Sequence, residues 1–214
     1  MERKNFRAGT LTAPLPAVLV SVGDAQSSNL ITIGWTGILC SDPPMTYISV
    51  RKKRHSYAML EKTREFVIHL TDENLARATD YCGIFTGAKV DKFEKCALTK
   101  VPSAVVAAPT VAEAPLALEC RVREIVPLGT HDVFVADIVN VSVREDLVDA
   151  GGRICLDRAH LLAYCHGEYF VLGKKIGAFG FSAAKKKKKI HTGGGKAHEK
   201  RKFGDRKSPH SGTH

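Results

Sequence analysis

Two long segments in the second half of the chain alternate between apolar and polar side chains. The first covers residues 118–125 and the second covers residues 133–143, and a short turn containing Gly129 separates them. Successive side chains of a β-strand point to opposite faces of the sheet, so this alternation is typical of strands with two unlike faces. The two segments therefore predict a long antiparallel β-hairpin, which any fold for this chain has to accommodate.

The rest of the chain predicts more strands than helices. Apolar runs suited to strands occupy 17–22, 30–34, 46–51 and 66–70, whereas helices are expected at 56–62, capped by His55 or Ser56, and at 72–82, ending at Gly83. Residues 83–96 are interpreted as irregular and residues 102–115 as a surface loop. The sequence shows neither βα alternation nor a G-x-G-x-x-G motif, which argues against a doubly wound parallel sheet. Because closure of a sheet removes its exposed edges, we predict a mainly β barrel with a few short helices.

The positive charge of the chain is concentrated at its C-terminal end. The net charge is +10, from 32 Lys and Arg against 22 Asp and Glu. Residues 185–214 hold eleven of the basic residues and only two acidic ones, so residues 1–184 are nearly neutral. The composition predicts one folded domain at 1–184 and a disordered basic Lys/Gly/His tail at 185–214. Nucleic acid is expected to bind only through this tail, since a nucleic-acid-binding domain usually carries its basic patch on the folded body; the alternative is a solvated tail without a partner.

The cysteines and the N-terminal residues indicate a cellular compartment. The six cysteines form no C-x-x-C pair and have no spacing typical of metal ligands, so we expect buried thiols and no metal site. The first residues are charged, and no apolar run approaches the roughly 18 residues that a membrane span needs. These features favour a protein of the reducing cytoplasm that does not bind membranes.

Residues 29–56 hold the strongest candidate for a functional site. A Gly-broken polar loop at 34–37 and the pair Pro43-Pro44 precede the expected strand 46–51, and a basic cluster follows at 51–55. Arg, Lys and hydroxyl groups at the end of a strand suit a phosphate, because charge-assisted hydrogen bonds are roughly twice as strong as neutral ones. The single Trp of the chain, Trp35, offers a flat face to a planar ring. The segment therefore suggests a phosphorylated aromatic cofactor, and the alternative is a hairpin with a solvated basic end.

Several short motifs occur in an order that is similar to that of a known family. They are Ser41-Asp42-Pro43-Pro44, Arg51 with His55-Ser56, Gly87 with Asp91-Lys92-Phe93, the turn Gly129–Val135, and Leu172-Gly173 with Ile176-Gly177. Together the matching segments span about residues 10–182, and the tail has no counterpart. With these motifs the chain resembles the flavin reductase-like family of FMN-binding split barrels, in its flavoredoxin-like branch.

The resemblance implies a six-stranded Greek-key split β-barrel that forms a homodimer, with FMN bound at the subunit interface. It also implies that the flavin ring lies along residues 32–37 and that the phosphate lies near residues 51–56. The chain departs from typical reductases of the family at Gly34-Trp35 and at Cys40, where those proteins have a loop rich in Ser and Thr. The departure favours a tightly held FMN over a flavin that enters and leaves as a substrate.

The candidate cofactor-binding residues fall into three groups. The phosphate candidates are Arg51, Arg54, His55 and Ser56, with Lys89 and Lys92 as secondary candidates. The candidates for the flavin edge or ribityl chain are Asn29, Thr32, Thr36 and Gly37, and the alternative for these is hydrogen bonding within turns. Trp35 is a candidate for stacking on the flavin, or else it is an aromatic residue of the core or the dimer interface.

His131 is the candidate catalytic residue. In the family pattern it faces the flavin near the place where nicotinamide stacks, and a pKa close to neutrality would let it relay a proton. The alternative is a turn histidine bonded to the backbone. Cys40 is expected to be a small buried thiol, and Tyr164 and Tyr169 are expected to pack the closing strand of the barrel.

Two functions remain open from the sequence. In the first, NADH or NADPH delivers hydride to N5 of FMN, and the reduced FMN passes electrons to a second acceptor. In the second, the chain is an FMN-binding electron carrier that a redox partner protein reduces, as Trp35, Cys40 and the basic tail suggest. The sequence names neither the physiological donor nor the acceptor.

Overall fold

The computed structural model describes residues 1–183. The predicted tail at 185–214 lies outside the described residues, and so do the predictions about its disorder and its partners. The chain divides into two compact units, residues 1–175 and 176–214. In the second unit, residues 179–183 form turns, in which the N–H of Phe181 donates to the carbonyl of Ala178. The first unit holds the helices and strands that follow.

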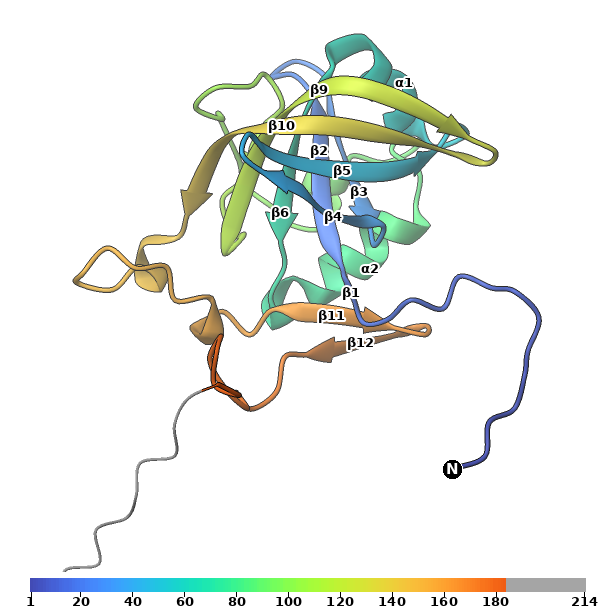
Figure 1. Ribbon diagram of the computed structural model, residues 1–214. Coiled ribbons are helices and arrows are strands. Elements are labelled where there is room, and N and C mark those ends of the chain that lie inside the picture. The colour runs from blue at the N-terminus through green and yellow to red at the C-terminus, as the bar shows by residue number, and fades with distance from the viewer. Residues whose placement is uncertain (184–214) are drawn as a thin grey trace, which may run out of the picture. The chain divides into compact units, whose positions relative to one another are not determined.

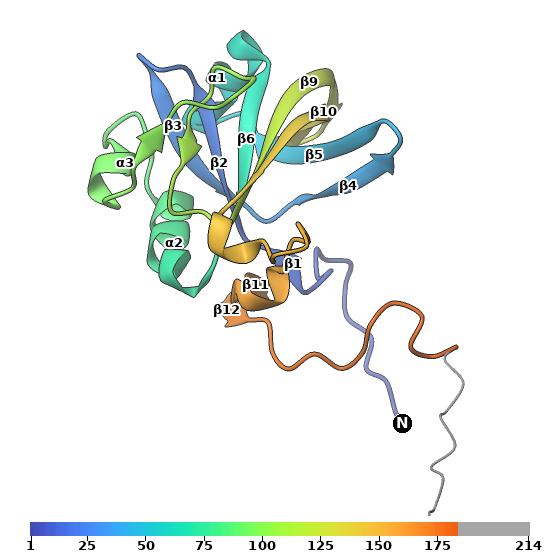
Figure 2. The same ribbon diagram turned by 90° about the vertical axis from the view of Figure 1, so that its left-hand side faces the viewer.

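The centre of the first unit is a seven-stranded antiparallel sheet (Figure 1). Its strands, in spatial order, are β3 (Ser28–Ile33), β2 (Val18–Gly23), β6 (Glu65–Leu70), β9 (Leu116–Leu128), β10 (His131–Val143), β5 (Pro44–Arg51) and β4 (Thr36–Ser41). The sheet is strongly curled, and its two outer strands, β3 and β4, do not pair with each other (Figure 2). The sheet has seven strands rather than the six expected, because residues 36–41 form an additional edge strand.

The predicted hairpin is confirmed. β9 and β10 pair in antiparallel register along their length, with two irregularities in the register. On β10 the side chains of Phe134 and Ala136 are fully buried, whereas Val133 and Val135 on the opposite face are half-buried. The alternation thus predicts the correct period, and the face that carries Phe134 is the one that packs into the core.

The main apolar core lies inside the curled sheet. It consists of Val18, Val20, Val22, Ile31, Ile33, Ile48, Val50, Tyr57, Leu60, Phe66, Ile68, Cys120, Phe134 and Ala136. Helix α1 (His55–Thr63) packs against β2 and contributes two of these side chains, Tyr57 and Leu60. Burial of a large apolar side chain stabilises a fold by about 1.5–3 kcal/mol, so this cluster fixes the first turn of α1 against the sheet.

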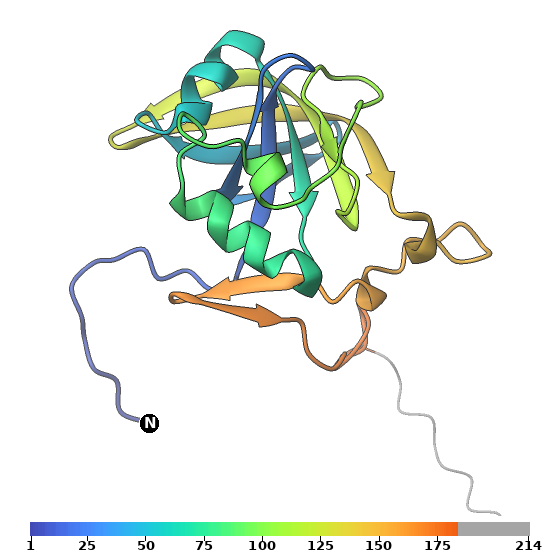
Figure 3. The same cartoon turned by 180° about the vertical axis from the view of Figure 1, so that it is seen from behind.

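A second apolar cluster attaches two further helices to the sheet. It joins Leu19 and Leu30 of the sheet to Leu75, Cys82 and Phe93. Through it, α2 (Ala76–Ile84) and the short α3 (Lys92–Lys95) lie beside β3, as Figures 2 and 3 show. Figure 2 shows these helices on the β2–β3 side of the sheet, away from the edge strand β4.

Helix α1 is predicted correctly, but its cap is not. The helix begins at His55, and Arg54 is its N-cap, with extended backbone and no side-chain hydrogen bond to the first turn. The prediction that His55 or Ser56 caps the helix is therefore wrong, since both residues already lie inside it. The first backbone N–H groups of α1 thus lack a side-chain cap.

The predicted helix at 72–82 is a 3-10 turn followed by an α-helix. The turn η1 (Glu73–Leu75) arises because the Asp72 carboxylate accepts a hydrogen bond from the N–H of Leu75 at 3.1 Å. Helix α2 follows at Ala76, and it continues past Gly83, where the sequence predicts its end.

Several short elements were not predicted. They are α3 within the supposedly irregular segment 83–96, β4, the pair β7 (Lys100–Val101) and β8 (Thr110–Val111), the turns η2 (Glu145–Leu147) and η3 (Leu156–Arg158), and a three-stranded sheet of β1 (Leu15–Pro16), β11 (Leu162–Cys165) and β12 (Glu168–Val171). Tyr164 and Tyr169 lie in this separate sheet with their ring centroids 5.4 Å apart. The prediction that they pack the closing strand of the barrel is therefore wrong.

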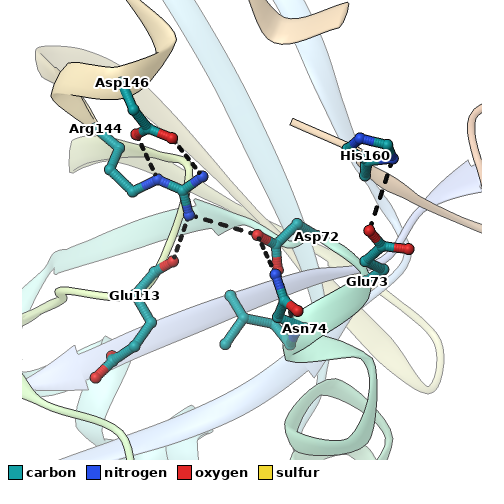
Figure 4. A network of polar contacts seen from close by, with 8 residues as sticks. Asp72, Glu73, Asn74, Glu113, Arg144, Asp146 and His160 are labelled. Atoms are coloured by element: carbon teal, nitrogen blue, oxygen red, sulfur yellow. Dashed lines mark hydrogen bonds and ion pairs between the residues drawn. The ribbon is translucent and has the colours of Figure 1, made fainter. Parts of the chain in front are cut away.

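A polar network joins the start of η1 to the segment that follows β10 (Figure 4). The Arg144 guanidinium lies 3.5 Å from the buried carboxylate of Asp72 and 2.7 Å from that of Asp146. It also donates to the carbonyl of Glu113 at 3.4 Å. A buried carboxylate without a charged partner would be costly, so Arg144 stabilises the turn that precedes α2.

The described residues also bear on the cysteines and on membrane spans. Within residues 1–183 all six cysteines are free; Cys82, Cys120 and Cys155 are buried as expected, whereas Cys40, Cys96 and Cys165 are only half-buried. The same residues contain no cluster of potential metal ligands. None of their helices combines the length and the apolar character that crossing a membrane requires.

Candidate functional site

The gap between β3 and β5 holds a cavity of about 250 Å³, which we call the aromatic pocket. Its lining comes from β3, from the link between β3 and β4, from β5, from the start of β10 and from the three-stranded sheet. The lining residues are Leu15, Ala17, Ile31, Thr32, Ile33, Gly34, Trp35, Ser49, Val50, Arg51, Arg54, His131, Tyr164 and Tyr169. The pocket therefore has one indole, two phenol rings and an imidazole around a largely apolar floor.

His131 and Trp35 form one wall of the aromatic pocket. Their ring centroids lie 4.5 Å apart. The Arg51 Nε donates to His131 Nε2 at 3.4 Å, and Thr130 Oγ1 lies 2.9 Å from Nδ1, so Nδ1 carries the proton and donates to Thr130. Burial, followed by the charges of Arg51 and Arg54, lowers the pKa of His131 below its ordinary value of 6.5. His131 is therefore a neutral imidazole at neutral pH.

A second cavity of about 290 Å³, the cationic pocket, adjoins the first. Its lining residues are Asn29, Ile31, Arg51, Lys53, Arg54, His55, Ser56, Phe85, Thr86, Gly87 and Lys92. The two pockets share Ile31, Arg51 and Arg54, and no acidic residue within 1–183 lines the second one. An anion in the cationic pocket would thus lie directly beside the occupant of the aromatic pocket.

The start of α1 opens into the cationic pocket. Its first N–H groups lack a side-chain cap, and no acidic residue occupies its first turn. Free N–H groups and the helix dipole make such an end a binding site for anions. The buried Ser56 hydroxyl accepts a hydrogen bond from Asn29 Nδ2 at 2.8 Å, so its own proton remains available to a ligand.

The basic residues predicted to bind phosphate differ in the contacts that their side chains already make. Arg54 donates to the carbonyl of Gly83 at 3.0 Å, which holds its guanidinium between α1 and α2. Lys92 is buried, and its ammonium donates to the carbonyls of Leu30 and Cys82 at 2.8 Å each. Burial lowers the pKa of Lys92. Lys92 is therefore mainly a structural cation behind the pocket, whereas the exposed Lys89 lines neither pocket.

The residues predicted to contact the flavin edge or ribityl chain also differ in whether they line a pocket. Thr32 lines the aromatic pocket, but its hydroxyl donates to the carbonyl of Thr79 on α2. Thr36 and Gly37 line neither pocket; they lie on β4, where the Thr36 hydroxyl donates to the carbonyl of Tyr47 at 2.5 Å. Cys40 also lies on β4 outside both pockets. A ligand role for Thr36 and Gly37 stays a prediction.

The structure adds residues to the site that sequence reasoning missed. Leu15, Tyr164 and Tyr169 reach the aromatic pocket from the three-stranded sheet. Lys53, interpreted from the sequence only as part of the basic cluster, lines the cationic pocket. No spacing in the sequence could have identified the tyrosines, because the sheet that carries them pairs β1 with strands near the other end of the domain.

The residues present fit a planar ring that carries a phosphate. The aromatic pocket supplies flat apolar and aromatic surfaces for a ring, and the cationic pocket supplies guanidinium groups and the free N–H groups of α1. A flavin mononucleotide has both parts joined in one molecule, and so does the flavin portion of a dinucleotide. The donor set therefore suits a phosphorylated flavin.

Comparison with known proteins agrees with this chemistry. The model of the flavin reductase like domain matches residues 11–173. The structure of the flavoredoxin of Desulfovibrio vulgaris (Miyazaki F) is similar, with a TM-score of 0.79 and 30% identity over 86% of this chain and 100% of that one. The FMN-binding protein of Thermus thermophilus has a TM-score of 0.70 and 26% identity over 83% of this chain and 99% of that one. A protein of Archaeoglobus fulgidus is 31% identical over 129 residues, which cover 60% of this chain and 72% of the relative. The chain belongs to the flavin reductase-like family of flavin-binding, split-barrel oxidoreductases.

Proposed function

We propose that the chain binds FMN and transfers electrons from NADH or NADPH, through the FMN, to a second acceptor. The observation that carries the proposal is the junction of the two pockets at Ile31, Arg51 and Arg54. A ring and a phosphate held in adjoining pockets match FMN, and the FMN-binding protein of Thermus thermophilus, 26% identical, supports the choice of the mononucleotide.

The cationic pocket would hold the phosphate. A phosphate monoester carries nearly two negative charges at neutral pH, which Arg51 and Arg54 balance. The uncapped N–H groups of α1 and the hydroxyl of Ser56 would complete its hydrogen bonds, while Lys53 adds positive charge at the rim and His55 lines the same pocket. Asn29 fixes the Ser56 side chain from β3.

The aromatic pocket would hold the ring and keep water away from it. Bound FMN supplies the chemistry, because it accepts hydride and releases electrons. Trp35, Tyr164 and Tyr169 supply apolar surfaces around the ring. His131 is neutral at neutral pH and presents its imidazole at the pocket wall, where it would orient the nicotinamide of the donor.

The second subunit of the proposed homodimer would pack on the β4 side of the sheet. β4 is an edge strand, and it carries the exposed side chains of Ile38 (68% exposed) and Leu39 (51% exposed), next to Trp35 (38% exposed). Unpaired edges with apolar side chains favour association. Because Trp35 also lines the aromatic pocket, a partner on this edge would place FMN at the subunit interface. Light scattering of the full chain, compared with Ile38→Glu, tests this arrangement; a monomer at micromolar concentration would contradict it.

An absorbance experiment tests the function directly. The full chain is saturated with FMN, freed of oxygen, and given NADH and then NADPH. The proposal predicts that the flavin absorbance near 450 nm bleaches with at least one nucleotide and returns when an acceptor is added. Flavin that binds but bleaches only with a reduced partner protein would instead identify an electron carrier, and flavin that does not bind would contradict the assignment of the pockets.

A further inference from the structure

The first turn of α1 is fastened to both sides of the open sheet. Ser56 accepts a hydrogen bond from Asn29 of β3 at 2.8 Å, and the next residue, Tyr57, donates its hydroxyl to Asp132 of β10 at 2.5 Å. β3 and β10 are four strands apart in the sheet order, and both contribute to the lining of the aromatic pocket. The two hydrogen bonds therefore make the start of α1 a bridge between the strand behind the cationic pocket and the strand that carries His131.

The Tyr57–Asp132 contact is buried, and the Tyr57 hydroxyl lies closer to the Asp132 carboxylate than the ammonium of Lys52 does. Tyr57 is 8% exposed and Asp132 is 3% exposed. The same carboxylate oxygen, Oδ2, lies 3.4 Å from the ammonium of Lys52, while Oδ1 is buried without a hydrogen-bond partner among the described residues. The Tyr57 ring also packs edge-on against Phe134, with centroids 5.4 Å apart. Leaving a buried carboxylate short of donors is expensive, so Asp132 depends on the Tyr57 hydroxyl.

The position of Asp132 gives this contact a consequence for the site. Asp132 directly follows His131 at the start of β10, where His131 is paired with Arg51 of β5. The backbone at the start of β10 is paired with β5 and β9, whereas the hairpin turn at residues 129–130 is exposed, so the Tyr57–Asp132 contact is a buried side-chain anchor at this end of the strand. The imidazole faces Arg51, Arg54, Thr130 and the Trp35 ring, and its orientation toward each depends on where β10 begins.

We propose that Tyr57 and Asp132 are positioning residues for His131, which fix its imidazole in the aromatic pocket by tying the start of β10 to the phosphate-binding turn of α1. The role rests on the proposed function only where catalysis is concerned, because the position of His131 can be measured without turnover. Removal of the Tyr57 hydroxyl would free the buried carboxylate, and the end of the hairpin would move to let water reach it. His131 would then lose part of its burial and its alignment with Arg51 and Arg54.

The test is a pH titration of the histidine ring signals by NMR in the full-length chain before FMN is added, so that no phosphate offsets the charges of Arg51 and Arg54. His131→Gln identifies the His131 signals by their absence. Tyr57→Phe removes only the anchoring hydroxyl, and we expect the His131 midpoint to rise toward 6.5, the ordinary value, because desolvation and the two guanidinium charges depress it in the parent protein. Tyr47→Phe is the matched control, since the Tyr47 hydroxyl makes no hydrogen bond to another described residue. The His131 midpoint in this variant should equal that of the parent protein.

A second variant separates anchoring from charge. Asp132→Asn keeps an acceptor for the Tyr57 hydroxyl and removes a negative charge beside His131, so the midpoint of the His131 titration should not rise.

The rate of flavin reduction by NADPH or NADH should fall about tenfold in Tyr57→Phe, since small misplacements of catalytic groups have effects of this size or larger. FMN affinity should change less than threefold.

The His131 midpoints and the rates of flavin reduction test the positioning role and the catalytic role separately. An unchanged His131 midpoint in Tyr57→Phe, or an equal rise in Tyr47→Phe or Asp132→Asn, would overturn the positioning role. A raised midpoint in Tyr57→Phe alone supports it. Full activity in His131→Gln would count against the catalytic part of the proposed function, and the midpoint would still decide the positioning role.

Discussion

The rings of Trp35 and His131 lie 4.5 Å apart, centroid to centroid, with their planes inclined by 39°. Trp35 stands in the link between β3 and β4, and His131 is the first residue of β10. Both line the aromatic pocket, so the contact places the only Trp of the chain beside the candidate catalytic group. The fluorescence of one residue can therefore report the protonation of the other.

The first prediction is that Trp35 fluorescence titrates with His131. A protonated imidazole quenches a neighbouring indole, so emission from the flavin-free chain should fall as the pH is lowered. The midpoint should lie below 6.5, because burial and the charges of Arg51 and Arg54 lower the pKa of His131. His131→Gln should abolish the step, and a step of equal size in that variant would mean that another group is the quencher.

The second prediction concerns a buried histidine that lines neither pocket. His69 is fully buried; its Nε2 accepts from the N–H of Val111 at 3.0 Å, and its Nδ1 lies 3.2 Å from the carbonyl of Leu19. Burial lowers the pKa of His69 to about 4 from 6.5. The unfolded chain therefore binds a proton on His69 between pH 6.5 and pH 4, while the folded chain does not. The free energy of unfolding should fall by up to about 3 kcal/mol as the pH drops through this window.

Urea unfolding at several pH values measures this loss. His69→Gln is the matched variant, because a Gln amide can make both hydrogen bonds without titrating. The pH dependence between 6.5 and 4 should be smaller in the variant by about the same 3 kcal/mol. Identical pH dependence in the two proteins would contradict the prediction.

The third prediction is that Glu119 holds the loop at residues 103–107. Its buried carboxylate accepts from the N–H groups of Ala104, Val105 and Val106 at 2.9, 2.6 and 3.1 Å, and from Asn140 Nδ2 at 2.8 Å. Burial favours a raised pKa for Glu119, but these hydrogen bonds outweigh it and lower the pKa. Glu119→Ala would leave four donors without their acceptor and should reduce the free energy of unfolding by about 3 kcal/mol. Glu124→Ala, an exposed position on the same strand, should change it by less than about 0.5 kcal/mol.

The fourth prediction concerns the backbone of the cationic pocket. A Cβ at Gly87 would lie 2.1 Å from Asn29 Oδ1 and 2.4 Å from its Cγ. Asn29 is buried and holds Ser56, so Gly87→Ala should displace the amide, break the bond to Ser56 and weaken FMN binding by about tenfold. Gly173→Ala is the control, because a Cβ there meets no atom of the described part of the chain within 4 Å. Equal FMN affinity in the two variants, measured by flavin fluorescence, would argue against a role for the Asn29–Ser56 pair.

The parts of the fold that were predictable are those with long periodic patterns. The hairpin at β9 and β10 has a clear period of two, and the apolar runs around Val20 and Phe66 are long enough to identify β2 and β6. β4 escaped prediction because Ile38 and Leu39 are adjacent apolar residues on an exposed edge, which breaks the alternation. The short α3 and the three-stranded sheet escaped it because four residues or fewer carry no usable period.

The site was predictable where one segment supplies it and not where distant segments meet. The basic cluster at 51–55 marked the cationic pocket, since charge and turn chemistry are local properties. The sequence could not show that the ammonium of Lys92 is held by two carbonyls, or that the Thr32 hydroxyl is bonded to α2. The sequence also could not show that Tyr57 and Asp132 are hydrogen-bonded, because they are far apart along the chain and meet only where α1 packs beside the start of β10.

The affinities of the full chain for FMN and for riboflavin test the central claim most directly. The two ligands share the ring and differ in the phosphate, so their ratio isolates the cationic pocket from the aromatic one. FMN should bind at least about 100-fold more tightly than riboflavin, and Arg54→Gln should reduce this ratio about tenfold or more. Equal affinities for the two ligands in the parent protein would contradict the assignment of the phosphate to the start of α1.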